Sequence, residues 1–474
     1  MRNRRGLLQL EGLTERIVPA VSIRAVDGDL LITGIANTNA GFQKLWVNVT
    51  GNNQVNIQDG GSAFGTGGVN RGVYAVTGDL IFSLSNRSDQ LTIDFNGAFT
   101  LDGSISANLF NGNDTVTITH STGAAAGFDG NLTIDGGNGT DALNINNTKA
   151  GSTFEIGGLV SFNGGAGGDT ANINDSSSSS MSIGAGLSLT RVNIVEVGSA
   201  NDVDISGNVT INASADKLIT NNFTIGGGTV NIAGALAITG GQGADTVALD
   251  TVNVVDVVPA EDEVLEISIN LDRSGTIAKS THNTLTMTDV QLGTNGTDAD
   301  FAYTGGTGDD SLEFVGTNDI SGDAVFVFGN GVNALVVSSG TTFYADVTVT
   351  GGKSDDTITL NNSVISGLLT ATMGNGTNEL TSAGTFEGGL TYTGGSNVDT
   401  VELTNAENLA GDVSISVGAG ADIVEITGIT TGVSVTSLTI DLGVDSVTDN
   451  LDYDTDFDSL ITILNQGSSD SINS

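Results

Sequence analysis

Short runs of alternating apolar and polar residues recur along most of the chain. In 356–360 and 399–403, Ile, Leu or Val alternates with polar residues after an initial Asp. The same period of two is seen in 346–350 and 389–393. This period predicts β-strands with one buried and one solvent-facing side.

A glycine-rich corner ending in Asp or Asn precedes the first strand of each unit. In the C-terminal third, units of about 23 residues begin at Gly305, Gly329, Gly351, Gly374, Gly394, Gly418 and Gly443. Their corners end at Asp310, Asn333, Asp356, Asn378, Asp399, Asp422 and Asp445. A single unit cannot bury its apolar face, but stacked units can do so for one another.

The repeat therefore predicts an all-β fold, an elongated right-handed parallel β-helix (β-solenoid) with coils of about 22–28 residues. We expect about 19 coils at a spacing of about 4.8 Å. The alternative is an array of β-sandwich domains, in which tight Asn-Gly or Asp-Gly hairpins would join antiparallel strands.

The expected organisation is one repetitive solenoid over 25–465, preceded by an export-like segment at 1–24 and followed by a polar tail at 466–474. Its most regular repeats occupy 305–464 and a loop insertion falls at about 250–300. Upstream corners are expected near Asp89, Asp114, Asp141, Asp169 and Asp202, and the interval 240–304 is close to three coils long.

The strongly negative net charge makes some classes of binding partner less favourable than others. The net charge is −41, and from residue 280 onward 27 Asp or Glu face a single Lys, Lys353. Nucleic acids and anionic membranes are disfavoured because their phosphates need Lys and Arg. Divalent cations are the natural counter-ligands, although acidity also keeps a strand-rich protein soluble. There is no Cys, and no apolar run reaches the roughly 18–20 residues of a transmembrane segment.

Four corners carry the full pattern Gly-Gly-x-Gly-x-Asp, at 136–141, 164–169, 240–245 and 305–310. This pattern resembles the calcium-binding nonapeptide of RTX proteins. The resemblance implies Ca²⁺ ligation by Asp141, Asp169, Asp245 and Asp310, with backbone carbonyls of the adjacent glycines. The copies recur once per coil and not in tandem, so the alternative is a corner that is capped by its own Asp side chain.

A weaker calcium candidate is the set of alternate carboxylates Asp452, Asp454, Asp456 and Asp458, which would share one face of a strand. His120 and His282 lie far apart and are expected at surface bends. No nucleophile elbow, metalloprotease helix or phosphate-binding loop occurs, so no catalytic residue and no cofactor other than Ca²⁺ is predicted.

The segment 10–20 reads Leu-Glu-Gly-Leu-Thr-Glu-Arg-Ile-Val-Pro-Ala. It resembles the Leu-Glu-x-Leu-Glu-x-Arg-x-x-Pro-Ala segment near the start of many planctomycete surface and secreted proteins. That resemblance implies an extracellular or cell-surface location.

We therefore expect a non-enzymatic structural or adhesive β-solenoid whose partner is a surface polymer, a glycan or a protein. The alternatives are an RTX-like calcium-binding repeat protein and a β-helix carbohydrate-active enzyme.

Overall fold

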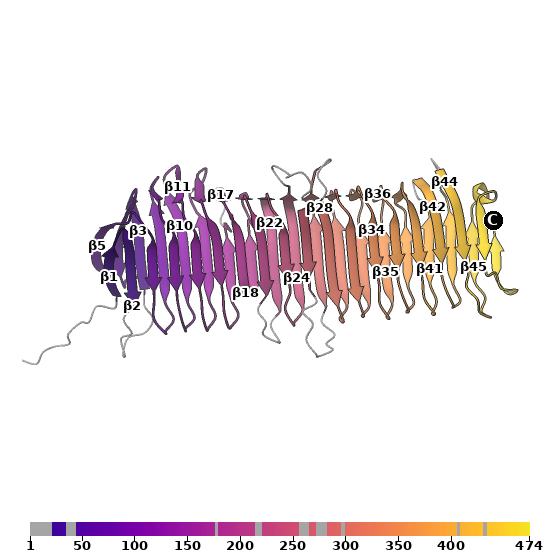
Figure 1. The fold of residues 1–474 in the computed structure, drawn as a ribbon, viewed down its shortest axis with the longest axis horizontal. Coiled ribbons are helices and arrows are strands. Elements are labelled where there is room, and N and C mark those ends of the chain that lie inside the picture. Colours follow the sequence, from indigo (N-terminus) through magenta and orange to yellow (C-terminus); the bar gives the residue numbers. More distant parts are fainter. Residues whose placement is uncertain are drawn as a thin grey trace, which may run out of the picture.

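The computed structural model describes residues 21–34, 44–175, 179–213, 220–255, 265–271, 282–294, 299–404, 408–429 and 434–474. The chain is all-β, with 61% strand and about 14 turns of stacked parallel coils. Figure 1 shows the coils following one another along a rod, from the N-terminal strands at one end to β45 at the other. The predicted β-solenoid is thus confirmed.

Most coils contain three strands, which stack in three columns from coil to coil. The first-strand column consists of β7 (Gln90–Asn96), β10 (Thr115–Thr122), β13 (Ala142–Asn147), β16 (Thr170–Ile173), β19 (Ile194–Val197), β22 (Asn221–Ile232), β24 (Asp245–Val254), β26 (Asn283–Thr288), β29 (Asp310–Val315), β32 (Asn333–Val337), β35 (Asp356–Leu360), β38 (Glu379–Ser382), β41 (Thr400–Thr404), β43 (Ile423–Thr427), β45 (Asn450–Tyr453) and β47 (Ser471–Asn473).

The second-strand column consists of β8 (Thr100–Leu101), β11 (Ala125–Phe128), β14 (Thr153–Ile156), β17 (Ser180–Ile183), β20 (Val203–Ile205), β27 (Gln291–Leu292), β30 (Asp319–Ile320), β33 (Thr342–Phe343), β36 (Val364–Ile365) and β39 (Thr385–Phe386). β22 and β24 are long enough to continue into it.

The third-strand column consists of β6 (Leu80–Ser83), β9 (Ile105–Asn108), β12 (Leu132–Asp135), β15 (Leu159–Asn163), β18 (Gly186–Val192), β21 (Asn208–Ala213), β23 (Leu236–Thr239), β25 (Leu265–Asn270), β28 (Ala299–Gly306), β31 (Ala324–Gly329), β34 (Val347–Thr350), β37 (Leu369–Thr372), β40 (Gly389–Thr393), β42 (Asn408–Ser416), β44 (Ser434–Asp441) and β46 (Ile461–Leu464). β42 also pairs with β39 of the second-strand column.

The pairing is parallel throughout the three columns, and equivalent residues of successive coils face each other. Leu312 pairs with Leu335, for example, and Phe326 with Val349. The β-sandwich alternative is therefore wrong, since it requires antiparallel hairpins. The alternation seen in the sequence sends the apolar residues of each strand inward, where they form one continuous core along the rod.

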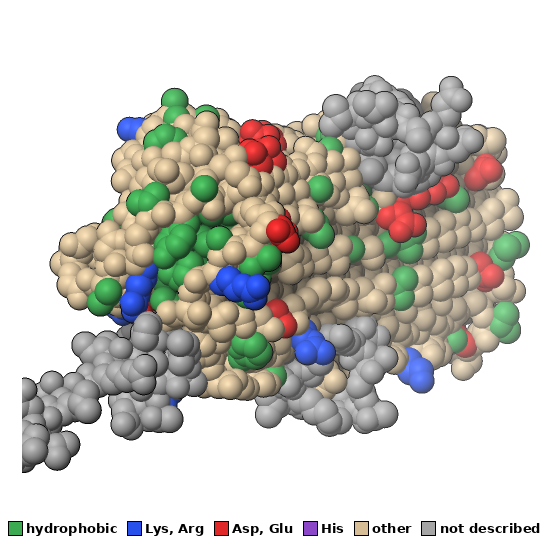
Figure 2. Space-filling view, turned by 60° about the vertical axis from the view of Figure 1, so that its left-hand side comes forward, with side chains coloured by type: hydrophobic (Ala, Val, Ile, Leu, Met, Phe, Trp, Pro, Cys, Tyr) green, Lys and Arg blue, Asp and Glu red, His purple; other side chains and the backbone are tan. Residues whose placement is uncertain are grey.

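The N-terminal strands differ from the coils. β1 (Val21–Val26) and β2 (Asp29–Gly34) form an antiparallel hairpin, and β3 (Lys44–Gly51), β4 (Gln54–Asp59) and β5 (Val69–Ala75) form an antiparallel sheet. β2 and β3 then pair in parallel with β6 and β7. In Figure 2 hydrophobic side chains gather at this end of the molecule, and on β5 Val69 and Val73 are exposed.

Two details of the predicted coil count and two of the predicted corner residues are wrong. The rod has about 14 turns and not about 19. The interval 240–304 supplies two coils, which begin at β24 and β26. The expected corner at Asp202 is displaced to Asn193, directly before β19, and the last expected corner residue, Asp445, is displaced to Asp449, directly before β45. Asp202 and Asp445 are both exposed.

The predicted loop around Pro259 and the segment 10–20 lie outside the described residues. No helix in the described ranges has the length and apolar character needed to cross a membrane.

Candidate functional site

A continuous ladder of Asp and Asn side chains runs along the rod, one residue per coil, at or just before the start of the first strand. We call it the Asx ladder. Its members are Asp89, Asp114, Asp141, Asp169, Asn193, Asn221, Asp245, Asn283, Asp310, Asn333, Asp356, Asn378, Asp399, Asp422, Asp449 and Asp470. All but Asp470, in the terminal coil, are buried.

Hydrogen bonds between successive coils define the ladder. In most steps the backbone N–H of one member donates to Oδ1 of the member in the next coil. The distance from N to Oδ1 is 2.8 Å from Asp114 to Asp141, 3.0 Å from Asp310 to Asn333, and 2.7 Å from Asp399 to Asp422. Each such bond ties one corner to the next, so the ladder couples neighbouring coils along the rod.

The second carboxylate oxygen holds the corner itself. Oδ2 of Asp356 accepts the N–H of Gly352 at 2.9 Å, and Oδ2 of Asp399 accepts the N–H of Gly395 at 2.8 Å. A Cβ at Gly351 or Gly394 would collide with Oδ2 of the same Asp. Glycine at that position thus leaves room for the carboxylate, which explains why the two residue types occur together in the repeat.

The four calcium candidates of the sequence all belong to the Asx ladder. Asp141 and Asp169 occupy successive coils and are joined by a hydrogen bond of 2.8 Å. Asp245 and Asp310 are not neighbours, because Asn283 lies between them. Within the described ranges, no three His, Cys, Asp or Glu side chains form a group that could hold a metal ion. Calcium binding at these residues stays a prediction.

The weaker calcium set does not lie on one strand. β45 ends at Tyr453, and the 3-10 turn η1 (Thr455–Phe457) follows it. Only Asp452 is therefore part of a strand, while Asp454 precedes the turn, Asp456 lies in it and Asp458 ends it. The expectation of a shared strand face is wrong because Phe457 turns into the core at this point.

Asp and Asn follow an ordered pattern along the ladder. From Asn221 to Asp399 they alternate strictly, whereas four Asp residues follow one another at each end, in the runs Asp89–Asp169 and Asp399–Asp470. In the alternating part the Asn amide donates to the next Asp, with distances from Nδ2 to Oδ1 of 2.9 Å at Asp310 and 2.8 Å at Asp399. In the runs of Asp this donor is missing.

The runs of Asp contain the carboxyl groups whose pKa is most clearly displaced. Burial raises the pKa of Asp114 to about 7, against the opposing effect of its hydrogen bond from Asp89, and the charges of Asp141 and Asp89 add to the rise. Burial likewise raises the pKa of Asp422 to about 7. The hydrogen bond from the backbone of Asp399 lowers this pKa, and the charges of the nearby carboxylates raise it further. Both groups thus favour the protonated form more than an exposed Asp does.

The prediction that His120 lies at a surface bend is wrong, because the residue is fully buried. Its Nδ1 lies 3.1 Å from Oδ1 of Asn147 and 3.3 Å from Oγ of Ser152, and its ring stacks on Phe154. Ser152 is also buried, so this Ser–His pair is closed to an external substrate and serves packing. His282 is exposed, as expected, and its Nε2 lies 3.2 Å from Oδ2 of Asp309.

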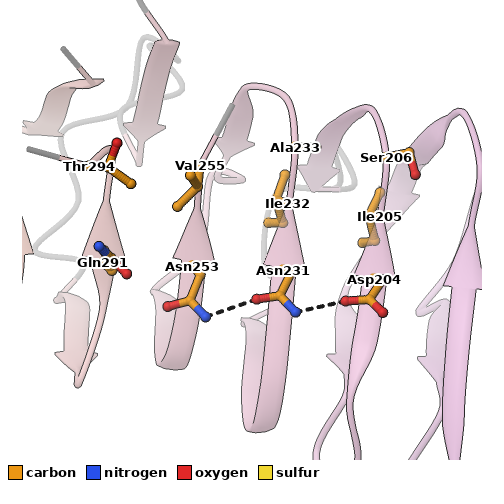
Figure 3. Close-up of a pocket in the computed structure, with 10 residues that line it drawn as sticks. All are labelled: Asp204, Ile205, Ser206, Asn231, Ile232, Ala233, Asn253, Val255, Gln291 and Thr294. Carbon is orange, nitrogen blue, oxygen red and sulfur yellow. Dashed lines mark hydrogen bonds between the residues drawn. The ribbon is translucent and has the colours of Figure 1, made fainter. Parts of the chain in front are cut away.

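A groove of about 510 Å³ lies over β20, β22, β24 and β27. Asp204, Asn231 and Asn253 form a row along it, drawn in Figure 3. Nδ2 of Asn253 donates to Oδ1 of Asn231 at 2.9 Å, and Nδ2 of Asn231 donates to Oδ1 of Asp204 at 2.7 Å. Gln291 continues the row in register. The groove therefore offers amide and carboxylate groups to solvent at intervals of one coil.

No protein-family model, curated protein or solved structure matches the chain.

Sequence reasoning missed Asn193, Asn221 and Asn283 as ladder members because no glycine lies in the five residues before them. The signal that identifies them is an Asp or Asn at or directly before an alternating strand, without reference to glycine. The groove was also missed, since its residues come from different coils and carry no motif.

Proposed function

We propose that this protein is a non-enzymatic, exported β-solenoid that serves as a structural or adhesive rod at the cell surface or in the extracellular matrix. The observation that carries the proposal is the Asx ladder. Its polar side chains are used in coil-to-coil hydrogen bonds from Asp89 to Asp470, so the repeated chemistry of the chain supports the rod itself.

The repetition also bears on the enzyme alternative. The paired carboxylates Asp309/Asp310 and Asp355/Asp356 that could have served hydrolysis recur at equivalent corners, and Asp310 and Asp356 are buried ladder members. Hydrolysis by two carboxyl groups needs both to reach the scissile bond. We expect no new reducing ends when the full chain is incubated with acidic polysaccharides, and their release would contradict the non-enzymatic assignment.

Export rests on the resemblance of the segment 10–20. Antibodies raised against the folded solenoid should label the outside of intact cells of the source organism. Labelling that requires permeabilised cells would contradict the extracellular location. Electron microscopy of the purified chain should show single rods, which tests the structural part separately.

The adhesive part is supported by the groove over β20, β22, β24 and β27. Its amide and carboxylate row suits hydrogen bonding to a hydroxyl-rich polymer such as a glycan, with one coil of about 4.8 Å comparable to one sugar ring. We expect the full chain to bind members of a glycan array and Asn253→Ala to bind them more weakly.

The matched control is Asn172→Ala. Asn172 is also a half-buried strand amide that donates to an Asn of a neighbouring coil, with 2.8 Å from its Nδ2 to Oδ1 of Asn144, but it lies outside the groove. Equal loss of binding in both variants would point to a general structural effect and contradict the groove as the contact.

A further inference from the structure

The C-terminal run of the Asx ladder places four carboxyl groups in successive coils. The backbone N–H of Asp399 donates to Asp422 at 2.7 Å, that of Asp422 to Asp449 at 2.9 Å, and that of Asp449 to Asp470 at 3.2 Å. The same bond from a backbone N–H to Oδ1 joins members of the alternating part, with 3.0 Å from Asp310 to Asn333. The difference is chemical, because no Asn amide separates the carboxyl groups.

The neighbours of Asp422 supply negative charge and no compensating cation. Asp399 and Asp449 face it from the adjoining coils, and Asp445 adds a third carboxylate. The buried phenol of Tyr392 also lies near Asp399 and Asp422. From residue 280 onward Lys353 is the single Lys or Arg of the sequence.

Asp422 also has a buried oxygen without a partner. The residue is 1% exposed, and its Oδ2 makes no hydrogen bond. Leaving a buried polar atom unpaired destabilises the folded state, and a charged group does so more than a neutral one. At Asp399, by contrast, both oxygens have a partner, because the N–H of Gly395 donates to Oδ2 and the amide of Asn378 donates to Oδ1.

We propose that the run Asp399–Asp422–Asp449–Asp470 is a proton-binding site, in which a proton on Asp422 removes one buried charge and supplies the donor that Asn supplies elsewhere in the ladder. The C-terminal coils then hold together more firmly in mild acid than above neutral pH. The proposed ligand is a proton, and the described residues offer no group of three metal-ligating side chains.

The direction of the pH effect follows from linkage. Burial raises the pKa of Asp422 to about 7, whereas an unfolded Asp titrates near 3.9, so the folded state binds more protons between these values. Stability from this group is fully present below the unfolded pKa and is lost as the pH rises through the folded one. Asp449 acts in the same direction, since burial raises its pKa as well.

The test compares wild type with Asp422→Asn. Asn occupies equivalent ladder positions elsewhere, so the variant is expected to fold. We expect the urea midpoint of the wild type to fall from about pH 5 to about pH 8. The midpoint of Asp422→Asn should fall less and should lie above that of the wild type at the higher pH. A variant that is no more stable than wild type there, or that keeps the same pH dependence, overturns the proposal.

The reverse substitution provides the matched control. Asn378→Asp joins Asp356 to Asp399 and so extends the C-terminal run of Asp into the alternating part. It should lower the urea midpoint at about pH 8 and steepen its fall with pH. An Asn378→Asp variant with unchanged pH dependence would also contradict the proposal.

Two further readouts separate a proton from a metal ion and a local from a global effect. Chelation with EGTA should leave the wild-type midpoint at about pH 8 unchanged. If EGTA lowers the urea midpoint of the wild type but not that of Asp422→Asn, the ligand at this site is a metal ion, and the proposal of a bound proton is wrong. Amide hydrogen exchange should localise the effect, with slower exchange in 399–404, 408–429 and 434–453 at the lower pH after correction for the intrinsic rate.

Discussion

Replacing Gly139 with Ala should strongly destabilise the rod, because the corner has no space for a side chain. Gly139 adopts φ +142°, and a Cβ there would overlap the carbonyl oxygen of Gly112 in the preceding coil. The backbone conformation costs about 1–2 kcal/mol in an L-residue. To make room for the Cβ, the coils must move apart. This movement weakens two hydrogen bonds of 2.8 Å, from the N–H of Gly112 to the carbonyl of Asn138 and from the N–H of Gly139 to the carbonyl of Ala166, at a cost of about 1 kcal/mol each. The sum is about 3–4 kcal/mol.

The assay is urea unfolding followed by circular dichroism, with hydrogen exchange to locate the damage. A solenoid loses stability mainly at the altered coil and its neighbours, so amides of 112–169 should lose protection first. The control is Gly168→Ala in the next corner, where a Cβ would meet nothing within 4 Å. That change should be neutral or stabilising by about 0.4–1 kcal/mol. Equal effects of both substitutions would refute the steric argument.

Three other perturbations test separate parts of the structure. Phe154→Ala should cost about 3–5 kcal/mol, because the ring is fully buried against Phe95 and Phe128, and exposed Val332→Ala should cost far less. Asn333→Ala should lower the free energy of unfolding, measured with urea, by about 1–3 kcal/mol, because it removes the hydrogen bond of 2.7 Å from Nδ2 of Asn333 to Oδ1 of Asp356. The same substitution at the exposed Asn361 should change the free energy of unfolding little. If the Gly-Gly-x-Gly-x-Asp corners bind Ca²⁺, millimolar Ca²⁺ should raise the melting temperature and EGTA should reverse the rise, and an unchanged melt contradicts that prediction.

The sequence was sufficient to predict the coil but not every corner. Alternation in strands such as Asp356–Leu360 identified inward and outward faces, which the structure confirms with Ile358 and Leu360 buried. Most corner residues were found where glycines accompany them, and Asp89 was found without glycine by its spacing from Asp114. Asn193 escaped because its corner turns through Arg191, which adopts φ 55° without glycine.

Burial of polar residues was the hardest property to foresee. His120 was expected at a bend because it has no partner motif, yet it continues the buried positions Val116 and Ile118 of β10, and Asn147 and Ser152 from the next coil satisfy its ring. Likewise, Asp445 and Asp449 are equally plausible corner residues by composition, and packing of Leu442 and Leu451 into the core leaves Asp445 outside. Such choices depend on neighbours 20 or more residues away, which a local pattern does not contain.

The acidity of the chain has a structural component beyond solubility. An Asp in the Asx ladder accepts hydrogen bonds from both its own corner and the adjoining coil, as Asp356 does with Gly352 and Asn333. An unbroken stack of ionised Asp would repel along its whole length at one-coil spacing. Alternation with Asn removes half of that charge in the middle of the rod while each Asn keeps one acceptor, Oδ1, and gains a donor, Nδ2. The runs of Asp at the two ends have no Asn between their carboxyl groups, so the pH response of the molecule should be strongest in its terminal coils. Burial also raises the pKa of Asp245 and Asp356, so the central coils should respond in the same direction but less.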